Sequence, residues 1–341
     1  MSTAAQVAVV IPVRLRRAHD PADLARCLAA LAACRPAPAQ VIVVDDGSSP
    51  PVQLPAPRPP DTALLRIPPS GPGPARNAGA AATTQPVLVF LDADVVVPPD
   101  AIGRLQALLD GHPQAAAAWA TVSPRHPEGG LVSRYKLHTH RHFTLRLGAG
   151  PGPWTTPHLT TMLAAVRRPA FETIGGFSPA WHTVSIEDVE LGRDLVDQGF
   201  TLLLDPELQV VHAHRFDLAS AARNDVHKLR RLVTATLGRR RRRGSSVEGG
   251  TATDGRMRRY ALGVPLGVGA VAAAGVGALP LSGALLLGLA LSERDLLRYL
   301  AAEEGPSFAL ACLPLIALER CTAATAAALG LADYLGARSG S

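Results

Sequence analysis

The residues of this sequence best suited to chemistry are two aspartates, Asp92 and Asp94, which are separated only by Ala93. They follow five apolar residues, 87–91 (VLVFL), whose β-branched and aromatic side chains are typical of a short buried strand. Ionised carboxylates are costly to bury unless they are paired or bound to a metal. Their hard oxygen atoms suit Mg²⁺ or Mn²⁺, ions that in turn bind phosphate oxygens. Taken alone, the pair fits a metal site and an acidic surface turn equally well.

A second pair of carboxylates, Asp45 and Asp46, follows another apolar run at residues 41–44 (VIVV). A carboxylate in this position can accept hydrogen bonds from a base N–H or a ribose hydroxyl, and Gly47 permits close approach of a ligand. The alternative is an acidic turn, because the sequence Asp-Gly-Ser is common in turns.

The elements before this second pair decide where it lies. Residues 7–13 (VAVVIPV) predict a first buried strand, and residues 20–34 have helical spacing of their apolar side chains. With the strand at 41–44 they form a parallel βαβ unit, in which ligands bind at the C-terminal ends of the strands. The unit therefore places Asp45 and Asp46 at the binding edge of a sheet.

The next segment, SGPGPARNAGAAATT, follows a short predicted strand at residues 63–67. It lacks the GxGxxG spacing of a dinucleotide-binding loop, so we exclude a Rossmann dinucleotide site. Residues 75–84 predict a helix, and Arg76 lies near its start. Because the N-terminus of a helix attracts anions, Arg76 could face a diphosphate; the alternative is a surface arginine. Another helix is predicted at residues 101–109.

The second half of the chain contains a further acidic centre and several histidines. We predict strands at residues 115–122, 160–166 and 208–211. The segment SIEDVELGRDL carries Glu187, Asp188 and Glu190, acids that the first turn of a helix also favours. Residues 131–147 carry three further histidines but no nearby carboxylate or cysteine. They predict a solvated or substrate-facing basic helix more than a metal site.

Four motifs that occur in order, IPV, VVDDGSS, GPARNAG and FLDAD, resemble the nucleotide-sugar half of the family 2 (GT-A fold) glycosyltransferases over residues 1–100. The resemblance implies an α/β fold with a mixed sheet flanked by helices and a nucleotide diphosphate sugar as donor. It places Asp45 and Asp46 on the nucleoside and makes Asp92 and Asp94 the metal–diphosphate motif, with Asp94 as the direct metal ligand. The expected nucleotide-sugar-binding residues are Pro12, Asp45, Asp46, Arg76, Asp92 and Ala93.

The same resemblance extends to the acceptor side. FETIGGF is followed about ten residues later by EDVELG, and this pattern implies that Asp188 is the catalytic base. The role fits, because direct displacement at an anomeric carbon needs a carboxylate that takes the proton of the acceptor hydroxyl. The resemblance also implies His212 as a third metal ligand, with His214 as the second choice and a structural histidine as the alternative. No QxxRW run follows, which favours transfer of one or a few sugars over polymer synthesis.

Composition points to a membrane. Hydrophobic residues make up 47% of the 341 residues and charged residues only 18%, and residues 260–292 carry no charge at all. Since a helix needs about 20 apolar residues to cross a bilayer, we expect one long tilted span or two short ones. Pro265 and Pro280 are the possible breaks. A second apolar block, 305–331, is interrupted by Glu319 and Arg320, and it fits a span with a polar kink or an interfacial helix.

The net charge is +6, and much of the surplus lies in five consecutive arginines from Arg239 to Arg243. By the positive-inside rule these arginines place the first 259 residues in the cytoplasm, at the cell membrane. Nucleic acid is the rival partner of such a run. Because an apolar span begins within twenty residues, we expect anionic lipid headgroups and no nucleic acid. The N-terminus has no charged segment before its apolar run, so we expect a strand there and not a signal peptide.

These observations predict four regions: a GT-A glycosyltransferase domain at 1–236, a basic juxtamembrane linker at 237–259, membrane-anchoring helices at 260–335 and a tail at 336–341. The expected function is that of an inverting, Mg²⁺- or Mn²⁺-dependent glycosyltransferase with a membrane-associated lipid or glycan acceptor. Two alternatives stay open. A nucleotidyltransferase would need a glycine-rich loop after the first strand, where the chain reads VRLRRAHDP. A non-catalytic membrane scaffold would keep the fold without turnover.

Overall fold

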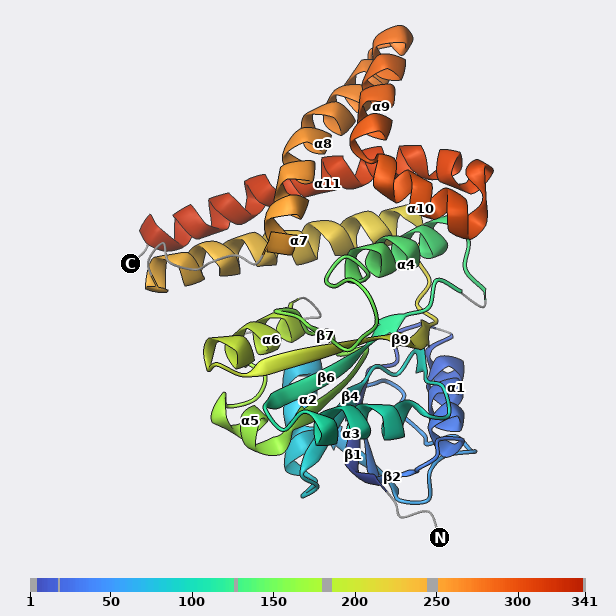
Figure 1. Cartoon of the computed structure of the whole chain (residues 1–341), viewed down its shortest axis with the longest axis vertical. Helices are drawn as coiled ribbons and strands as arrows, with labels where there is room; N and C mark the ends of the chain where they lie inside the picture. Colours follow the sequence, from blue (N-terminus) through green and yellow to red (C-terminus); the bar gives the residue numbers. More distant parts are fainter. Residues whose placement is uncertain (1–4, 18, 126–127, 180–185, 244–250, 340–341) are drawn as a thin grey trace. The chain divides into compact units, whose positions relative to one another are not determined.

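The computed structural model describes residues 5–17, 19–125, 128–179, 186–243 and 251–339, without the side chains of 5, 240–243, 251–262 and 338–339 (Figure 1). The chain divides into two compact units. The sheet unit consists of Met1–Glu128 and Phe143–His214, and the helical unit consists of Gly129–His142 and Arg215–Ser341. The predicted regions 1–236, 237–259, 260–335 and 336–341 stay a prediction.

One mixed β-sheet forms the centre of the sheet unit. Its strands run in the order β3-β2-β1-β4-β8-β6-β9-β5, and β7 pairs with β9. The strands β3, β2, β1 and β4 are parallel to one another, whereas β8 is antiparallel to both β4 and β6. This architecture confirms the predicted mixed α/β sheet. The strands are β1 (Ala5–Val13), β2 (Pro38–Asp46), β3 (Thr62–Ile67), β4 (Val87–Leu91), β5 (Val95–Val96), β6 (Ala115–Val122), β7 (Trp154–Thr155), β8 (Leu163–Arg167) and β9 (Thr201–His212).

The helices of the sheet unit cover the sheet through apolar stripes. On α1 the predicted stripe of Leu24, Cys27, Leu28 and Leu31 is fully buried. The helices α2, α5 and α6 share one core with alternate residues of β4, among them Phe90, as expected where successive strand side chains point to opposite faces. These helices are α1 (Asp20–Ala32), α2 (Pro72–Ala81), α3 (Ala101–Gly111), α5 (Arg168–Thr173) and α6 (Glu187–Asp197).

The sheet brings the acidic motifs to one edge. The strands β2, β1 and β4 are parallel, so their C-terminal ends lie together, and Val13 pairs with Asp45 in register. The chain then turns through Asp92, and the two-residue strand β5 pairs antiparallel with the end of β9. This second pairing places the segment that follows β4 beside the end of β9, close to His212.

The second unit is entirely helical among the residues that the structure describes. Its helices are α4 (Leu131–Thr144, up to His142), α7 (Leu218–Arg243), α8 (Thr251–Gly275), α9 (Leu279–Ser292), α10 (Arg294–Glu304) and α11 (Pro306–Ser339). The uncharged segment 260–292 contains the end of α8 and all of α9, and a short turn at residues 276–278 joins the two helices. Pro265 lies inside α8, whereas Pro280 lies in the first turn of α9.

The helix α11 is continuous where the sequence suggested an interruption. Its two charged residues at the predicted break are paired: Arg320 donates to Glu293, and Glu319 accepts a hydrogen bond of 2.5 Å from the Tyr135 hydroxyl. Because each charge has a partner, the two residues can lie inside a continuous helix without leaving an uncompensated buried charge. Within the described part of the chain, Pro306–Ala337 is one helix that is long and apolar enough to cross a membrane, while Gly263–Gly275 and Leu279–Ser292 are shorter.

Candidate active site

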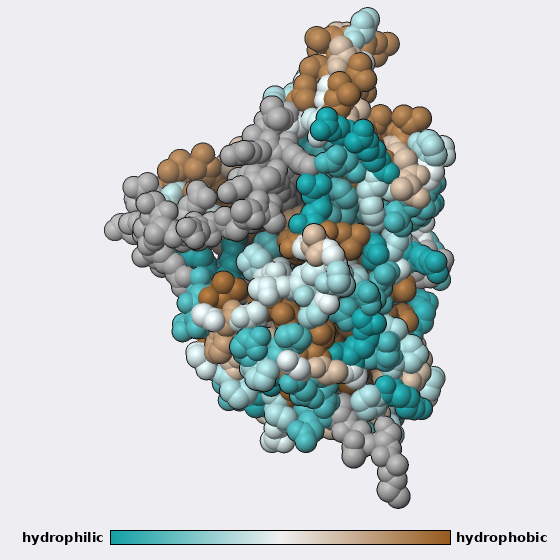
Figure 2. Space-filling view, viewed as in Figure 1, coloured by the Kyte–Doolittle hydropathy of each residue, from teal (hydrophilic) through white to brown (hydrophobic). Residues whose placement is uncertain are grey.

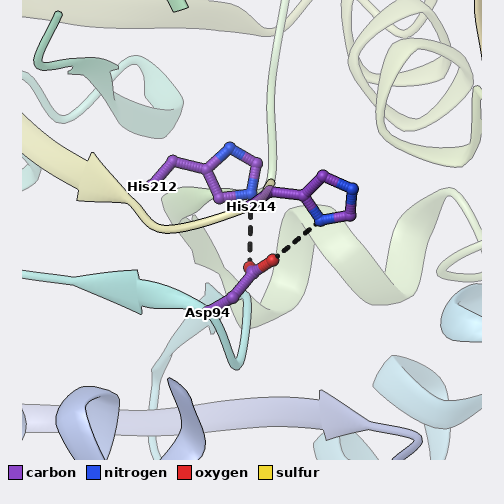
Figure 3. Close-up of side chains that lie close together, drawn as sticks. All are labelled: Asp94, His212 and His214. Atoms are coloured by element: carbon purple, nitrogen blue, oxygen red, sulfur yellow. Dashed lines mark hydrogen bonds and ion pairs between the residues drawn. The ribbon is translucent and has the colours of Figure 1, made fainter. Parts of the chain in front are cut away.

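A carboxylate and two imidazoles meet at the edge of the sheet, and we call them the Asp94 cluster (Figure 3). Asp94 Oδ1 lies 3.2 Å from His212 Nε2, and Asp94 Oδ2 lies 3.1 Å from His214 Nδ1. Between 21% and 26% of each side chain is exposed, so solutes can reach the cluster. The sequence favoured His212 over His214, but the structure brings both to the same carboxylate.

Backbone pairing fixes the geometry of the Asp94 cluster. Val95 on β5 pairs with His212 on β9, and the Ala213 N–H donates a hydrogen bond of 2.8 Å to the Asp94 carbonyl. His212 and His214 are two residues apart in an extended segment, so their side chains leave the same side of the chain. Asp94 is therefore held opposite both histidines by main-chain contacts that do not depend on its side chain.

Electrostatics keeps Asp94 ionised. Burial alone would raise the pKa of the Asp94 carboxyl, but the charge of His212 and the hydrogen bonds from His212 and His214 hold that pKa well below its ordinary value. The ligand atoms of the three residues lie within 4.8 Å of one another. One carboxylate and two imidazoles with this spacing fit a divalent cation, and imidazole ligands suit a transition metal better than Mg²⁺.

The first aspartate of the motif has a different partner. Arg76 donates to Asp92 Oδ1 at 2.7 Å and, through its other terminal nitrogen, to Glu187 Oε1 at 3.0 Å. Both Arg76 and Glu187 are buried, and the guanidinium lies 5.4 Å from the ring centroid of Phe177. Arg76 thus joins the end of β4 to the start of α6, and it is not the exposed arginine that the sequence allowed. Its direct contact with a diphosphate stays a prediction.

The predicted base is carried by the first turn of α6. Asp188 is half-buried, and its Oδ1 accepts a hydrogen bond of 2.8 Å from the Val189 N–H. The preceding residue, Glu187, is the partner of Arg76. Because Arg76 also binds Asp92, one guanidinium links the element that carries Asp188 to the segment that carries Asp92 and Asp94. The expected start of this helical segment at Ser185 lies outside the described residues.

Asp45 is buried and holds the loop that follows β2. Its Oδ1 accepts the Ser48 N–H at 2.8 Å, and its Oδ2 accepts the Val52 N–H at 3.2 Å and Arg66 Nη1 at 3.1 Å. Burial would raise the pKa of Asp45, but the hydrogen bonds from Ser48 and Val52 and the charge of Arg66 lower it below its usual value. Asp45 is therefore an ionised carboxylate that anchors the loop.

Asp46 anchors the loop before α2 in a similar way, by accepting backbone hydrogen bonds. It accepts the Ser70 N–H at 2.6 Å and the Gly71 N–H at 3.1 Å. Asp45 and Asp46 together hold two loops at the end of β2, and contact of either with a nucleoside stays a prediction. Pro12, near the end of β1, pairs in register with Val44, and both Pro12 and Ala93 are half-buried at this edge.

Sequence reasoning missed one residue of the site. Arg17 follows β1, and its Nη1 lies 3.3 Å and 3.4 Å from the two ring nitrogens of His214. The run VRLRRAHDP has no glycine for a nucleotidyltransferase loop, but its arginines follow a strand that ends at the binding edge. A basic loop at this position is the signal that would have identified Arg17.

Comparison with known proteins gives a family resemblance over the first half of the chain. The family model for Glycosyl transferase family 2 matches residues 8–175. Two curated relatives are the pre-mycofactocin glycosyltransferases of two strains of Mycobacterium tuberculosis, each 38% identical over 224 residues. That match covers 62% of this chain, and the chain spans 43% of the length of these relatives.

A solved structure shows a similar fold. A mannosyltransferase from Pyrobaculum calidifontis, solved in complex with GDP-Man and Mn²⁺, superposes with a TM-score of 0.53 at 17% identity. The match covers 98% of this chain and 88% of the mannosyltransferase. At this identity the likeness concerns the fold, and it agrees with the mixed sheet flanked by helices described above.

Replacement of Glu187 by Gln should destabilise the sheet unit. The change removes a charge-assisted hydrogen bond from a buried guanidinium, which is expected to cost about 1–3 kcal/mol of unfolding free energy. Glu172→Gln is the matched control, because Glu172 is 63% exposed in its pair with Arg168, and loss of an exposed pair costs about 0–1 kcal/mol. Urea unfolding measures both variants, and equal losses would contradict the bridging role of Arg76.

The stabilisation by Asp45 should depend on pH in one direction. Its pKa in the folded chain lies below the ordinary value of 3.8, so its contribution is present above that value and is lost as the pH falls through the folded pKa. At pH 7, Asp45→Asn should lower the unfolding free energy by about 1–3 kcal/mol. In urea titrations the gap between the wild type and Asp45→Asn should narrow below pH 4. A gap that widens on acidification would contradict this account.

Proposed function

This chain belongs to glycosyl transferase family 2 through its residues 8–175, and from that premise we propose that it transfers a sugar from a nucleotide diphosphate sugar to a membrane-associated acceptor. The observation that carries the proposal is the Asp94 cluster at the C-terminal edge of the sheet. In α/β sheets ligands bind at this edge. Carboxylates with metal-binding geometry at such a place are suited to a diphosphate-bearing donor.

In this proposal Asp94, His212 and His214 would hold a divalent cation, Mg²⁺ or Mn²⁺. The two imidazoles favour Mn²⁺, because Mg²⁺ prefers oxygen ligands. The Pyrobaculum mannosyltransferase, whose fold is similar, was solved with Mn²⁺ and GDP-Man, which supports a divalent metal here. When bound, the ion would neutralise negative charge on the leaving diphosphate.

The remaining donor contacts follow the edge of the sheet. Pro12, Asp45 and Asp46 form the nucleoside end, where Asp45 and Asp46 hold the surrounding loops. Asp92 and Ala93 form the diphosphate end of the site. Arg76 acts as a positioning residue in this scheme, because its guanidinium is occupied by Asp92 and Glu187.

Asp188 serves as the base in the proposed reaction. The oxygen of the acceptor hydroxyl forms a bond to the anomeric carbon while the bond from that carbon to the diphosphate oxygen breaks. The hydroxyl proton passes to the Asp188 carboxylate, and the nucleoside diphosphate leaves. A single displacement of this kind inverts the anomeric configuration. The half-buried position of Asp188 and the link from its neighbour Glu187 through Arg76 to Asp92 support this role.

The proposed acceptor is a lipid-linked or cell-surface glycan at the cell membrane, with the catalytic domain, residues 1–236, on the cytoplasmic side. The apolar helices Gly263–Gly275, Leu279–Ser292 and Pro306–Ala337 together support an association with the membrane. The predicted headgroup contacts of Arg239 to Arg243 involve mostly side chains outside the described residues, and they remain part of the proposal. The name of the curated relatives adds pre-mycofactocin to the acceptors that should be tried.

Two substitutions separate the proposed base from the proposed metal ligand. Asp188→Asn should keep Mn²⁺-dependent binding of the donor but lower transfer about 10²–10⁴-fold, because it removes a general base. Asp94→Asn should lose both binding and transfer. Asp100→Asn, at an aspartate that is 61% exposed, is the matched control.

Binding is read as thermal stabilisation of the detergent-purified chain by UDP-, GDP- and dTDP-sugars with and without Mn²⁺. Transfer is read with the stabilising donor and a panel of lipid phosphates, glycans and pre-mycofactocin. Unchanged transfer in either variant would overturn the role of that residue. Stabilisation by no donor would favour the non-catalytic scaffold.

Arg17 provides a second test, because its exposed guanidinium lies beside His214 and a diphosphate bound at the Asp94 cluster would attract it. Arg17→Ala should raise the Kd for the nucleoside diphosphate about tenfold, as expected for the loss of one charge-assisted contact of about 1.5 kcal/mol. The Kd for the nucleoside should stay the same. Arg16→Ala, at its exposed neighbour, is the control. Equal weakening of nucleoside and diphosphate binding by Arg17→Ala would contradict a phosphate contact.

A further inference from the structure

The helices α8 and α9 form an apolar hairpin within the helical unit. It comprises Gly263–Gly275, a short turn and Leu279–Ser292 (Figure 1). Residues 260–292 contain no charged side chain, and from Gly263 onward the polar side chains are only Ser282 and Ser292. Both helices are therefore apolar on nearly every side, whereas a surface helix of a soluble protein carries polar residues on its outer face.

Many large apolar side chains of this hairpin are exposed, although Leu289 is buried. Val276 at the turn is 82% exposed and Leu279 is 68% exposed. Leu281, Leu287 and Leu291 are also more than half exposed. In the space-filling view hydrophobic residues cover the end of the hairpin (Figure 2). Contiguous exposed apolar surface of this kind marks a site of interaction with protein or membrane.

The hairpin turn has the internal hydrogen bonding that lipid would demand. The N–H groups of Val276, Gly277 and Ala278 donate to carbonyls in the last turns of α8, and the Leu279 N–H donates to the Gly277 carbonyl. Gly277 adopts a φ of +75°, the left-handed conformation that lets the helix end in this way. Unpaired backbone groups are costly in hydrocarbon, whereas these donors are paired.

The two hydroxyl groups of the hairpin are also paired. Ser282 Oγ donates to the Ala270 carbonyl at 2.9 Å and so connects α9 to α8, and Ser292 Oγ donates to the Leu289 carbonyl at 2.8 Å. Small residues allow the two helices to approach, since a Cβ at Gly288 would lie 3.2 Å from Leu266 Cδ2. Small residues and internally paired hydroxyls are typical of helix contacts inside membranes.

The length of the hairpin excludes a full crossing. The 14 residues of α9 rise about 21 Å at 1.5 Å per residue, less than the ~30 Å thickness of the hydrocarbon core. At the end of α9 away from the turn, Glu293 forms a buried ion pair with Arg320 of α11. Arg320 fits beside Gly263 and Gly267 of α8, where a Cβ would lie within 2.8 Å of its side chain. The hairpin thus has an apolar tip and an ion pair at its base.

The longer apolar helix α11 is a weaker candidate for insertion as it is packed. It lies along α7, a helix rich in arginine, with Arg230 of α7 paired to Asp333 and Thr234 bonded to the Gly330 carbonyl. A charged helix such as α7 cannot enter hydrocarbon at low cost. Because α11 packs against α7 along its C-terminal half, that half stays outside the hydrocarbon with α7.

We propose that the α8–α9 hairpin enters one leaflet of a lipid bilayer by its apolar tip and returns to the same side, with the Glu293–Arg320 pair left at the membrane surface. The occupant of this surface is the acyl region of a bilayer, because every polar group named in the turn is paired and the tip residues are aliphatic. The proposal deepens the membrane location proposed above, but it does not depend on sugar transfer.

Flotation with vesicles of phosphatidylcholine and phosphatidylglycerol tests the insertion. The variant Val276→Asp with Leu281→Asp should lose vesicle binding more than tenfold, because each added charge would have to enter hydrocarbon. Leu64→Asp with Leu218→Asp, at two exposed leucines outside the hairpin, is the matched control and should float like the wild type. Retained helicity and an unchanged Tm in detergent show that the variant is folded. Undiminished flotation of the hairpin variant would overturn the proposal.

Labelling at the turn distinguishes a returning hairpin from a span. A fluorophore on Val276→Cys, in a Cys321→Ala background, should be quenched by nitroxides in the acyl chains. In a separate sample, the unlabelled thiol at position 276 should be protected from impermeant maleimide on both sides of the vesicle. Val196→Cys on α6 is the control and should react from the side of the protein. Reaction of position 276 from the far side would show a span, and its reaction from the near side would show no insertion. Either result overturns the proposal. The proposal also fails if the chain is an oligomer in detergent, and if the Val276→Asp, Leu281→Asp variant dissociates that oligomer but still floats with the vesicles.

Discussion

The pairing of β5 with β9 is the constraint on which the candidate site depends. The strand β5 has only two residues, and by itself it contributes little stability. Its value lies in register: Val95 opposite His212 places the preceding Asp94 beside two histidines that are 118 and 120 residues further along the chain. A shift of one residue would turn these side chains to the opposite face. The cluster is therefore specified by the backbone, and the carboxylate is presented before any ion is bound.

A second constraint is the buried guanidinium of Arg76. A buried cation is tolerated only where carboxylates compensate it, and here Asp92 and Glu187 do so. The two carboxylates belong to elements 95 positions apart in sequence. Arg76 makes the end of β4 and the start of α6 one electrostatic unit. Arg76 compensates the charge of Asp92, whereas His212 and His214 contact Asp94. The two aspartates of one motif therefore have different partners.

The sequence was informative where a pattern is local. The run VLVFL is fully buried as predicted, and the stripe on α1 faces the core, because strand and helix periodicities are set by neighbouring residues. The equal placement of His212 and His214 could not be predicted, since it depends on a strand too short to show any alternation. The burial of Arg76 depends on Glu187, 111 residues away. Arg17 was missed because a basic loop has no periodic signal.

The helical unit shows why hydropathy alone is an insufficient guide to membrane contact. By length and composition α11 is the better candidate, and the charges at Glu319 and Arg320 look like an interruption of it. The packing of α11 changes both conclusions, because its C-terminal half lies against the arginine-rich α7 and its two charged side chains are paired. The partners that neutralise these charges, Tyr135 and Glu293, are distant in sequence, and the apolar length of α11 is used partly to pack against other helices. The shorter hairpin leaves many of its large aliphatic side chains exposed, and its two hydroxyl groups are paired within it. Exposure combined with internal hydrogen bonding, rather than length, is what a surface that enters lipid requires.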